Sequence, residues 1–197
     1  MFFIVRRVRI GKRCLIDDEV KGRAQLRLRV LEIRDEPQAR QAHRELAREE
    51  FDFLLDLRPD DRWPGYIARL ERQRNGLDLP AGFVPATFLV AVADRDLVGR
   101  VSIRHELNEY LSEVGGHIGY GVRPAFRRRG YATQMLRQAV EIARSLGIER
   151  ALVTCDGDNT ASASTIERCG GVLEEAARRL DDPKKSRRYW IDVHANP

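Results

Sequence analysis

The sequence predicts an α/β domain, because segments with a strand pattern and segments with a helical period follow one another along a single chain. In residues 26–30, leucine and valine alternate with arginine, as they do on a half-buried strand. In residues 132–146, by contrast, the apolar residues recur every three or four positions, which is the period of an amphipathic helix. The tripeptide Asp94–Asp96 separates two apolar runs and predicts a tight β-hairpin.

Helical period and turn residues place the other elements of the first half of the chain. Ala39, Ala42 and Leu46 share one helical face. A second periodic segment ends near Gly76, as helices commonly end at glycine. The elements expected here are a strand over residues 26–30, helices from Glu36 to about Phe53 and from Trp63 to Asn75, a loop around Pro80, Gly82 and Pro85, and strands over Thr87–Ala93 and Leu97–Ile103.

The second half of the chain alternates strands and helices more regularly. The elements expected here are a strand from Gly115 into a basic turn, a helix opened by Gly130, a strand over Ala151–Cys155, a short helix from Asn159 to Gly170, a strand over Gly171–Leu173, a turn at Asp181–Pro183, and a last strand over Arg188–Val193. No repeat or low-complexity linker interrupts this order, so we expect residues 26–197 to form one domain.

Composition narrows the class of protein. A chain of 197 residues with 43% hydrophobic and 33% charged residues is typical of a globular domain with an ample core. No apolar run approaches the roughly 20 residues that span a bilayer, so we expect no membrane partner. Residues 1–25 form a basic N-terminal extension to which we assign no role, and Arg6 and Arg7 cut its apolar start too short for a signal peptide.

Three cysteines, Cys14, Cys155 and Cys169, form no Cys-x-x-Cys pair. They are interpreted as free thiols in a reducing compartment, so a cytoplasmic location is expected and no metal site is. The formal net charge is +5, yet the basic residues are interleaved with 30 acids and no nucleic-acid motif is present. We therefore expect no nucleic-acid partner; the contrary hypothesis, binding through residues 1–25 and 184–188, would make DNA retention strongly salt-dependent.

The basic turn before the long helix is the most informative segment. Residues 117–122 have a strand pattern, Pro124 ends it, and Arg127–Arg129 precede Gly130 at the start of the helix. The first turn of a helix leaves backbone N–H groups unpaired and carries partial positive charge, and a glycine lets a bulky anion approach them closely. Neighbouring arginines add forked donors suited to phosphate, so this turn predicts a phosphate-bearing ligand. The glycine patterns of nucleotide hydrolases and Rossmann dehydrogenases are missing.

The spacing Arg127-x-x-Gly130-x-Ala132, with a strand before it and a helix after it, resembles the cofactor loop of the GNAT superfamily of acyl-CoA-dependent N-acetyltransferases. The likeness covers roughly residues 26–193, and Gly115–Tyr120 resembles a bacterial branch of that family. It implies a mixed, mostly antiparallel central sheet flanked by helices. It also implies that two parallel strands separate and that the acyl-CoA inserts where the sheet splays.

The same resemblance implies acetyl-CoA as co-substrate and assigns the residues that would hold it. The amides of residues 128–133 would bind the pyrophosphate, the Val122 N–H would stabilise the thioester oxygen, and Asn159 would contact the pantetheine arm or order its pocket. The full set of candidate cofactor-binding residues is Tyr120, Gly121, Val122, Arg127, Arg128, Arg129, Gly130, Tyr131, Ala132, Thr133, Asn159 and Ser162.

Acetyl transfer to an amine needs a general base, because an alkyl ammonium with a pKa of about 10.4 is almost wholly protonated at pH 7. His117 stands where many members of the family have a glutamate, and an imidazole suits base chemistry near neutral pH. A histidine satisfied within the sheet is the competing interpretation. Glu113 is the second candidate base, with a surface acid as the alternative; His105 and Glu106 are third choices.

The proton donor for the leaving thiolate is missing from its usual place. The family has a tyrosine seven residues after the asparagine, whereas this chain has Ile166. Ser164 or Cys169 could substitute, or local packing could explain both. Two hypotheses therefore stand: direct acetyl transfer to a primary amine, and a non-catalytic acyl-CoA-binding or sensor module.

The acceptor is expected to be a small-molecule or protein amine, and a homodimer is possible. Carboxylates at Glu49, Glu50, Asp52 and Asp56 surround Phe51 and would suit a cationic amine. A solvated helix end is the plainer interpretation of that cluster.

Overall fold

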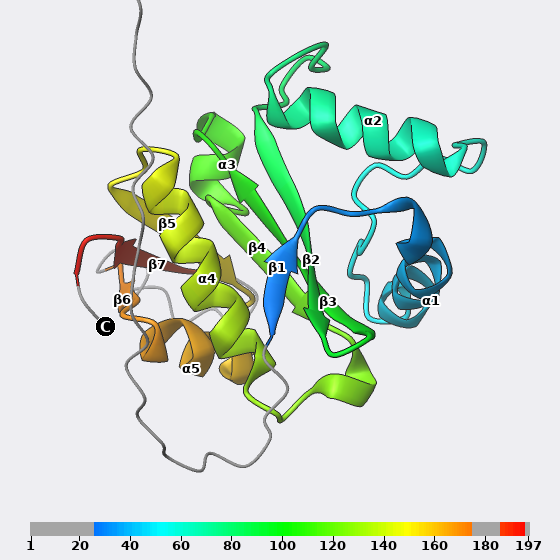
Figure 1. Ribbon diagram of the computed structural model, residues 1–197. Helices are drawn as coiled ribbons and strands as arrows, with labels where there is room; N and C mark the ends of the chain where they lie inside the picture. Colours follow the sequence, from blue (N-terminus) through cyan, green and yellow to red (C-terminus); the bar gives the residue numbers. More distant parts are fainter. Residues whose placement is uncertain (1–25, 175–185, 196–197) are drawn as a thin grey trace, which may run out of the picture.

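A computed structural model describes residues 26–174 and 186–195 (Figure 1). The extension at residues 1–25 and the turn expected at Asp181–Pro183 lie outside this part of the chain. The elements are β1 (Arg27–Arg29), η1 (Ile33–Asp35), α1 (Glu36–Ala47), α2 (Trp63–Arg74), β2 (Ala86–Ala93), β3 (Asp96–Arg104), α3 (Glu109–Glu113), β4 (Ile118–Val122), η2 (Pro124–Phe126), α4 (Tyr131–Ser145), β5 (Arg150–Cys155), α5 (Thr160–Arg168), β6 (Val172–Leu173) and β7 (Arg187–Asp192). None of the described helices is long and apolar enough to cross a membrane.

The strands form two sheets that part between β4 and β5. One sheet has the order β1-β2-β3-β4 and the other the order β5-β7-β6, and every ladder is antiparallel in the described residues. Within the part of the chain that the structure describes, one isolated bridge, from Gly116 to Val153, joins them. The expected α/β fold with a mostly antiparallel sheet is confirmed, and the strands part between β4 and β5.

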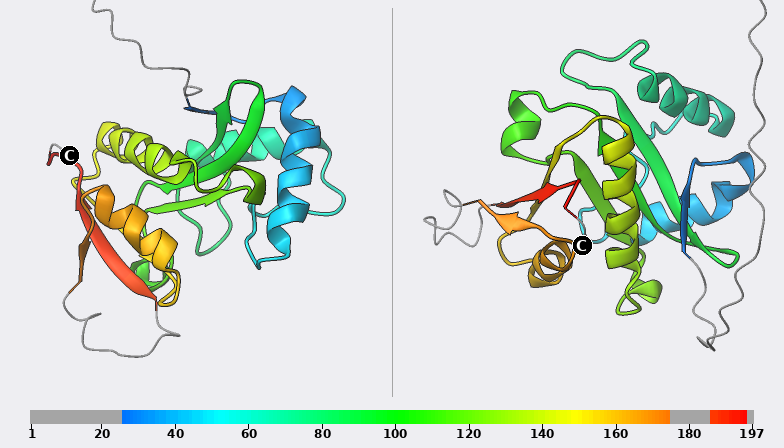
Figure 2. Two further views of the ribbon diagram at one scale, coloured as in Figure 1. Left: turned by 90° about the horizontal axis from the view of Figure 1, so that it is seen from below. Right: turned by 60° about the vertical axis from the view of Figure 1, so that its left-hand side comes forward.

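Helices cover both faces of the first sheet (Figures 1 and 2). The core on the side of α4 includes Ile118, Val122, Met135 and Ala139, whereas the core on the side of α1 and α2 includes Leu46, Phe53, Trp63 and Phe88. Because β2 lies between these two layers, all of its residues are buried. This explains why its sequence is apolar almost throughout instead of alternating with polar residues.

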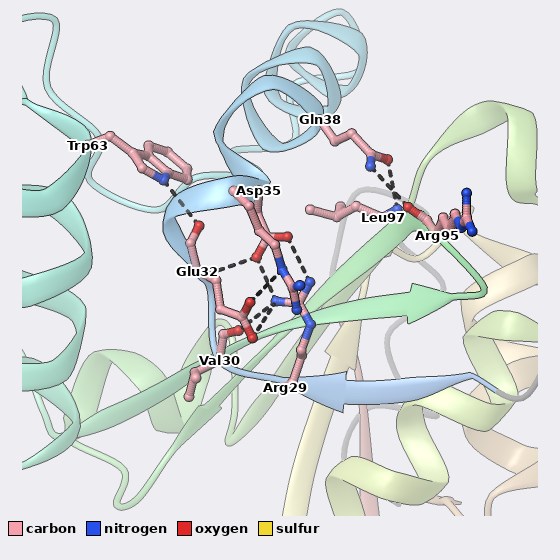
Figure 3. Close-up of polar contacts among 9 residues, drawn as sticks. Arg29, Val30, Glu32, Asp35, Gln38, Trp63, Arg95 and Leu97 are labelled. Carbon is pink, nitrogen blue, oxygen red and sulfur yellow. Dashed lines mark hydrogen bonds and ion pairs between the residues drawn. The ribbon is translucent and has the colours of Figure 1, made fainter.

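Polar contacts fix the entry of the chain into the helical layer (Figure 3). The guanidinium of Arg29 donates to both carboxylate oxygens of Asp35, at 2.6 and 2.7 Å. Asp35 also accepts from the N–H of Glu32 at 2.8 Å, and the carbonyl of Glu32 accepts from the indole N–H of Trp63 at 3.2 Å. The buried Asp35 carboxylate therefore ties β1 to the start of α1, and the Glu32 carbonyl ties the same turn to α2.

Gln38 fixes α1 against the β2–β3 hairpin (Figure 3). Its side-chain oxygen accepts from the N–H of Leu97 at 2.9 Å, and its amide donates to the carbonyl of Arg95 at 3.1 Å. The hairpin itself turns at Asp94, as the sequence predicted, with φ of +53°.

Two expectations of the sequence are corrected here. The helix expected to reach Phe53 ends at Ala47, because the chain turns at Glu50 (φ +57°) and the N–H of Phe51 returns to the carbonyl of Leu46 at 3.1 Å. This turn sends Phe53 into the core instead of along the helix. The short helix α3, capped by the side chain of Asn108, was not expected at all.

A buried ion pair joins α1 to the end of β4. Arg123 is 6% exposed, and its guanidinium donates to the two carboxylate oxygens of Glu45 at 2.8 and 2.9 Å. A third donor of the same side chain reaches the carbonyl of Leu97 at 2.9 Å. The contact with Arg123 holds the pKa of Glu45 below its usual range.

We expect Glu45→Gln to lower the free energy of unfolding by about 2 kcal/mol, because it leaves the Arg123 guanidinium buried without a counter-charge. A folded-state pKa below the unfolded value means that this contribution is present above the ordinary carboxyl pKa of 4.5 and is lost as the pH falls through the folded value. Urea unfolding of both proteins at several pH values measures the difference.

Glu141→Gln is the control, since Glu141 forms an exposed pair with Arg144 on α4 and should change stability by less than about 0.5 kcal/mol. Equal effects of the two substitutions would contradict the account of Glu45.

Candidate active site

The outer edge of β4 is open where the two sheets part. Along an antiparallel strand, successive residues point their backbone groups alternately toward and away from the partner strand. The N–H of Arg123 bonds to β3 at Val98, and the carbonyl of His117 accepts from the N–H of Arg104. The backbone groups of Tyr120 and Val122 therefore face away from β3, toward β5, where no described strand pairs with them.

His117 is the last tie between the two sheets. Its N–H donates to the carbonyl of Leu152 at 2.7 Å, and its ring Nδ1 accepts from the N–H of the same residue at 3.0 Å. The side chain is 9% exposed, and burial, followed by the charge of Arg104, lowers its pKa. With Nδ1 accepting, the neutral ring carries its proton on Nε2, so it can take up a proton only by giving up the bond to Leu152.

The turn from β4 into α4 presents unpaired N–H groups. Gly130 caps the helix in a left-handed conformation with φ of +79°, and the first intrahelical bond runs from the N–H of Gln134 to its carbonyl. The N–H groups of residues 131–133 thus have no acceptor within the helix. A Cβ atom placed on Gly130 would meet no heavy atom within 4 Å, which leaves open space beside these donors.

The three arginines of the turn differ in their surroundings. Arg127 donates to both carboxylate oxygens of Glu49, at 3.0 and 2.5 Å, and to the carbonyl of Val122 at 3.0 Å. Its donors brace the turn against the segment after α1. Arg128, with φ of +62°, and Arg129 are exposed beside the helix start.

Three further candidates meet across the gap between β4 and α5. The Tyr120 hydroxyl lies 2.9 Å from the Ser162 hydroxyl, and Asn159 caps α5 by accepting from the N–H of Ser162 at 2.9 Å. Burial raises the pKa of Tyr120 to about 12. Ile166 is fully buried in the core on the side of α4, so no phenol stands at the place of the usual donor.

The remaining candidates lie in different settings. Glu113, at the end of α3, is exposed and reaches Arg188 at 3.3 Å. The His105 ring nitrogen Nε2 lies 2.8 Å from the Thr87 hydroxyl, and burial lowers the pKa of this histidine. Cys169 is buried near the carbonyl of Thr133, and burial raises the pKa of its thiol. No cluster of three or more metal-ligating side chains occurs among the described residues.

The face of β4 opposite α4 adjoins two arginines of β3, Arg100 and Arg104, that were not among the sequence candidates. A Cβ atom on Gly121 would lie 2.5 Å from the Phe51 ring, so only glycine fits there. The guanidinium of Arg100 lies 4.4 Å from the centroid of the same ring, and Arg104 is next to it on the same face of β3. The available signal was an arginine within the largely apolar run of residues 97–103.

Comparison with known proteins supports this architecture. A family model described as an acetyltransferase (GNAT) domain matches residues 25–172. No curated protein matches the chain in sequence.

Several solved structures share the fold. RimJ from Mycobacterium smegmatis, in complex with CoA-disulfide, is 20% identical, with a TM-score of 0.59 over 85% of this chain and 81% of that one. Spermidine N-acetyltransferase from Vibrio cholerae, in complex with CoA and spermine, is 17% identical, with a TM-score of 0.59 over 87% and 97%. The microcin C7 self-immunity acetyltransferase MccE, in complex with acetyl-CoA and AMP, is 15% identical, with a TM-score of 0.57 over 86% and 93%.

At these identities the structural likeness concerns the fold, while the family match extends over most of the chain. Together with the open edge of β4 and the unpaired amides before α4, that match identifies the chain as a member of the GNAT family of acetyl-CoA-dependent N-acetyltransferases.

Proposed function

We propose that this protein transfers the acetyl group of acetyl-CoA directly to a primary amine, on a small molecule or a protein, where β4 and β5 part. The observation that carries the proposal is the outward-facing N–H of Val122, on a strand edge that no described strand covers. A preorganised N–H donor of this kind stabilises the charge that develops on a carbonyl oxygen during acyl transfer. When bound, acetyl-CoA supplies the activated acetyl group.

Different groups of the chain would bind different parts of acetyl-CoA. The amides of residues 131–133, together with Arg128 and Arg129, suit a pyrophosphate, and the open space at Gly130 lets it approach. Tyr120, Asn159 and Ser162 line the gap through which the pantetheine arm would run. Arg127 contributes by holding the turn in place through Glu49.

Glu113 and His117 are the residues proposed to accept the proton of the amine, and they differ in how they can do so. Glu113 has carboxylate lone pairs open to solvent, so it can accept a proton through water without disturbing the sheet. His117 can accept one only when it releases the N–H of Leu152, so we assign it chiefly to holding β5 against β4. A cytoplasmic location and a homodimer stay predictions of the sequence.

The second candidate function is a non-catalytic acyl-CoA sensor. The buried Ile166 in place of a phenol favours it, because the leaving thiolate then lacks its usual proton donor. Thiol release from acetyl-CoA across a panel of amines separates the two functions. Turnover with any amine supports the transferase; tight acetyl-CoA binding without turnover supports the sensor.

We expect Gly130→Val to weaken acetyl-CoA binding about 100-fold, because the side chain would occupy the space beside the unpaired amides and remove charge-assisted hydrogen bonds. Isothermal calorimetry measures the affinity. Gly147→Val is the matched control: Gly147 has nearly the same φ, +81°, and equally open surroundings, but lies after α4. Both variants pay the same backbone strain of about 1–2 kcal/mol. Comparable coenzyme affinities for the two variants would refute the assignment of the loop.

A second prediction concerns His117. We expect His117→Asn to keep most of the activity, since an asparagine oxygen can accept from the N–H of Leu152 as Nδ1 does, whereas His117→Leu leaves that donor buried and unpaired. Glu113→Gln should lower kcat/KM at least tenfold. Steady-state kinetics between pH 6 and 9 test all three variants. Equal inactivity of the Asn and Leu variants, both folded, would instead make His117 the base.

The stability of the His117→Asn variant gives an independent readout. Because burial lowers the pKa of His117, the unfolded chain binds a proton more readily than the folded one, and wild-type stability should fall as the pH drops below about 6.5. The Asn variant should lose less stability over the same pH range in chemical unfolding. An identical loss in both proteins would show that the pKa of His117 is the same in the folded and the unfolded chain.

A further inference from the structure

We infer that the acceptor carries an anionic group, a carboxylate or a phosphate, besides its amine, and that Arg100 and Arg104 bind this group beside Gly119. The inference rests on the proposed function, because it names the class of acceptor for the same transfer.

Arg100 is a buried cation with no ion-pair partner among the described residues, although the charge of Asp52 acts on it from farther away. It is 5% exposed, yet no carboxylate of the described residues lies within ion-pair distance of its guanidinium. Its Nη2 donates to the carbonyl of Asp52 at 2.9 Å and its Nη1 to that of Gly119 at 3.5 Å, while its Nε has no partner among the described residues. Burial, followed by the charge of Arg104, lowers the pKa of Arg100 to about 10. A buried charge is costly unless it is paired.

Arg104 adds a second positive charge to the same place. Its Nη1 donates to the carbonyls of Gly115 and Gly116, at 3.3 and 3.2 Å, and no described acid pairs with it either. Carbonyl oxygens satisfy N–H donors but do not neutralise the charge. Two neighbouring guanidinium groups that lack acids repel each other, so an anion between them would be bound strongly.

Gly119 places no side chain against the two guanidinium groups. A Cβ atom built on Gly119 would lie 3.6 Å from the Nη1 of Arg104 and 3.7 Å from the Nη1 of Arg100, with no other heavy atom of the described residues within 4 Å. Gly119 itself is only half-buried, so the position can be reached from outside. A carboxylate or phosphate that approaches the two guanidinium groups past the bare Gly119 backbone would accept from both arginines.

The nearby carboxylates do not fill this role. Asp52 has a side chain that is 55% exposed and lies 3.6 Å from His43, while Glu49 is engaged by Arg127. Asp56 is exposed. The carboxylate cluster around Phe51, which could have favoured a cationic amine, therefore lies at the edge of this face of the sheet. The inner part of the face, at Arg100 and Arg104, is positive.

The position of the arginines relative to the reaction sets a length for the acceptor. Gly119 and Val122 are three residues apart on one strand, so their backbone positions lie about 10 Å apart, and we take this as the approximate spacing of the anion and the reacting amine. Amino acids, aminoalkyl acids and aminoalkyl phosphates fall within this span.

The first experiment measures anion binding without turnover. Inorganic phosphate is titrated into the protein with CoA saturating, so that the cofactor loop is already occupied, and the binding is followed by calorimetry. We expect wild type to bind phosphate, and Gly119→Ala and Arg104→Gln to bind it at least tenfold more weakly. Gly119→Ala should fold normally, since its methyl group meets only ordinary contacts. Gly65→Ala, on α2 in open surroundings, is the matched control and should bind like wild type. Equal phosphate affinity in wild type and Gly119→Ala overturns the inference.

The second experiment compares pairs of amines that differ only in charge: γ-aminobutyrate with its amide, ε-aminocaproate with its amide, and phosphoethanolamine with ethanolamine, with spermidine as a cationic amine. We expect wild type to prefer the anionic member of at least one pair by tenfold or more in kcat/KM, and Gly119→Ala to lose that preference. Acetylation of neutral or cationic amines at equal or higher rates overturns the inference while the proposed function stands. Turnover with no amine, beside phosphate binding that depends on Gly119, overturns the proposed function and leaves the anion site.

Discussion

The separation of β4 from β5 is the constraint on which the site depends. His117 holds the two strands together through both its N–H and its ring, and beyond it no described residue of β5 pairs with β4. An unpaired strand edge inside a protein is costly unless other groups satisfy it. Here the outward N–H of Val122 stays available for a ligand. The same histidine that the sequence suggests as a base is thus needed to define where the opening begins.

Both faces of β4 serve this opening, and side-chain size separates their roles. Ile118, Tyr120 and Val122 face the core on the side of α4, where Tyr120 reaches across to α5. Gly119 and Gly121 face the other side, where their lack of a side chain admits Phe51 and brings Arg100 and Arg104 close to the backbone. The co-substrate and the acceptor can therefore approach one strand from different directions, as direct transfer requires.

The features that could be predicted from the sequence are those that depend on residues close together in the chain. The turn at Gly130, the helix after it and the hairpin at Asp94 rest on local backbone chemistry, and the structure has all three where they were expected. The end of α1 at Ala47 could not be foreseen, because it depends on Phe53 packing into a core built from distant segments. The partner of His117 likewise lies 35 positions away in the sequence.

The arginines show most clearly what cannot be predicted from the sequence. The chain contains 35 lysines and arginines, and the sequence alone can single one out only by its place in a known motif. Arg127 occupies the signature position, but Glu49, 78 residues away, takes up its forked donors. Arg100 has no signature, yet it lies buried without any acid among the described residues. An arginine is free to bind an anion only where the fold brings no carboxylate to it, so the location of the acids decides which arginines act. This argues for the acceptor site on β3, and for the main-chain amides with Arg128 and Arg129, rather than Arg127, as the groups that bind the co-substrate.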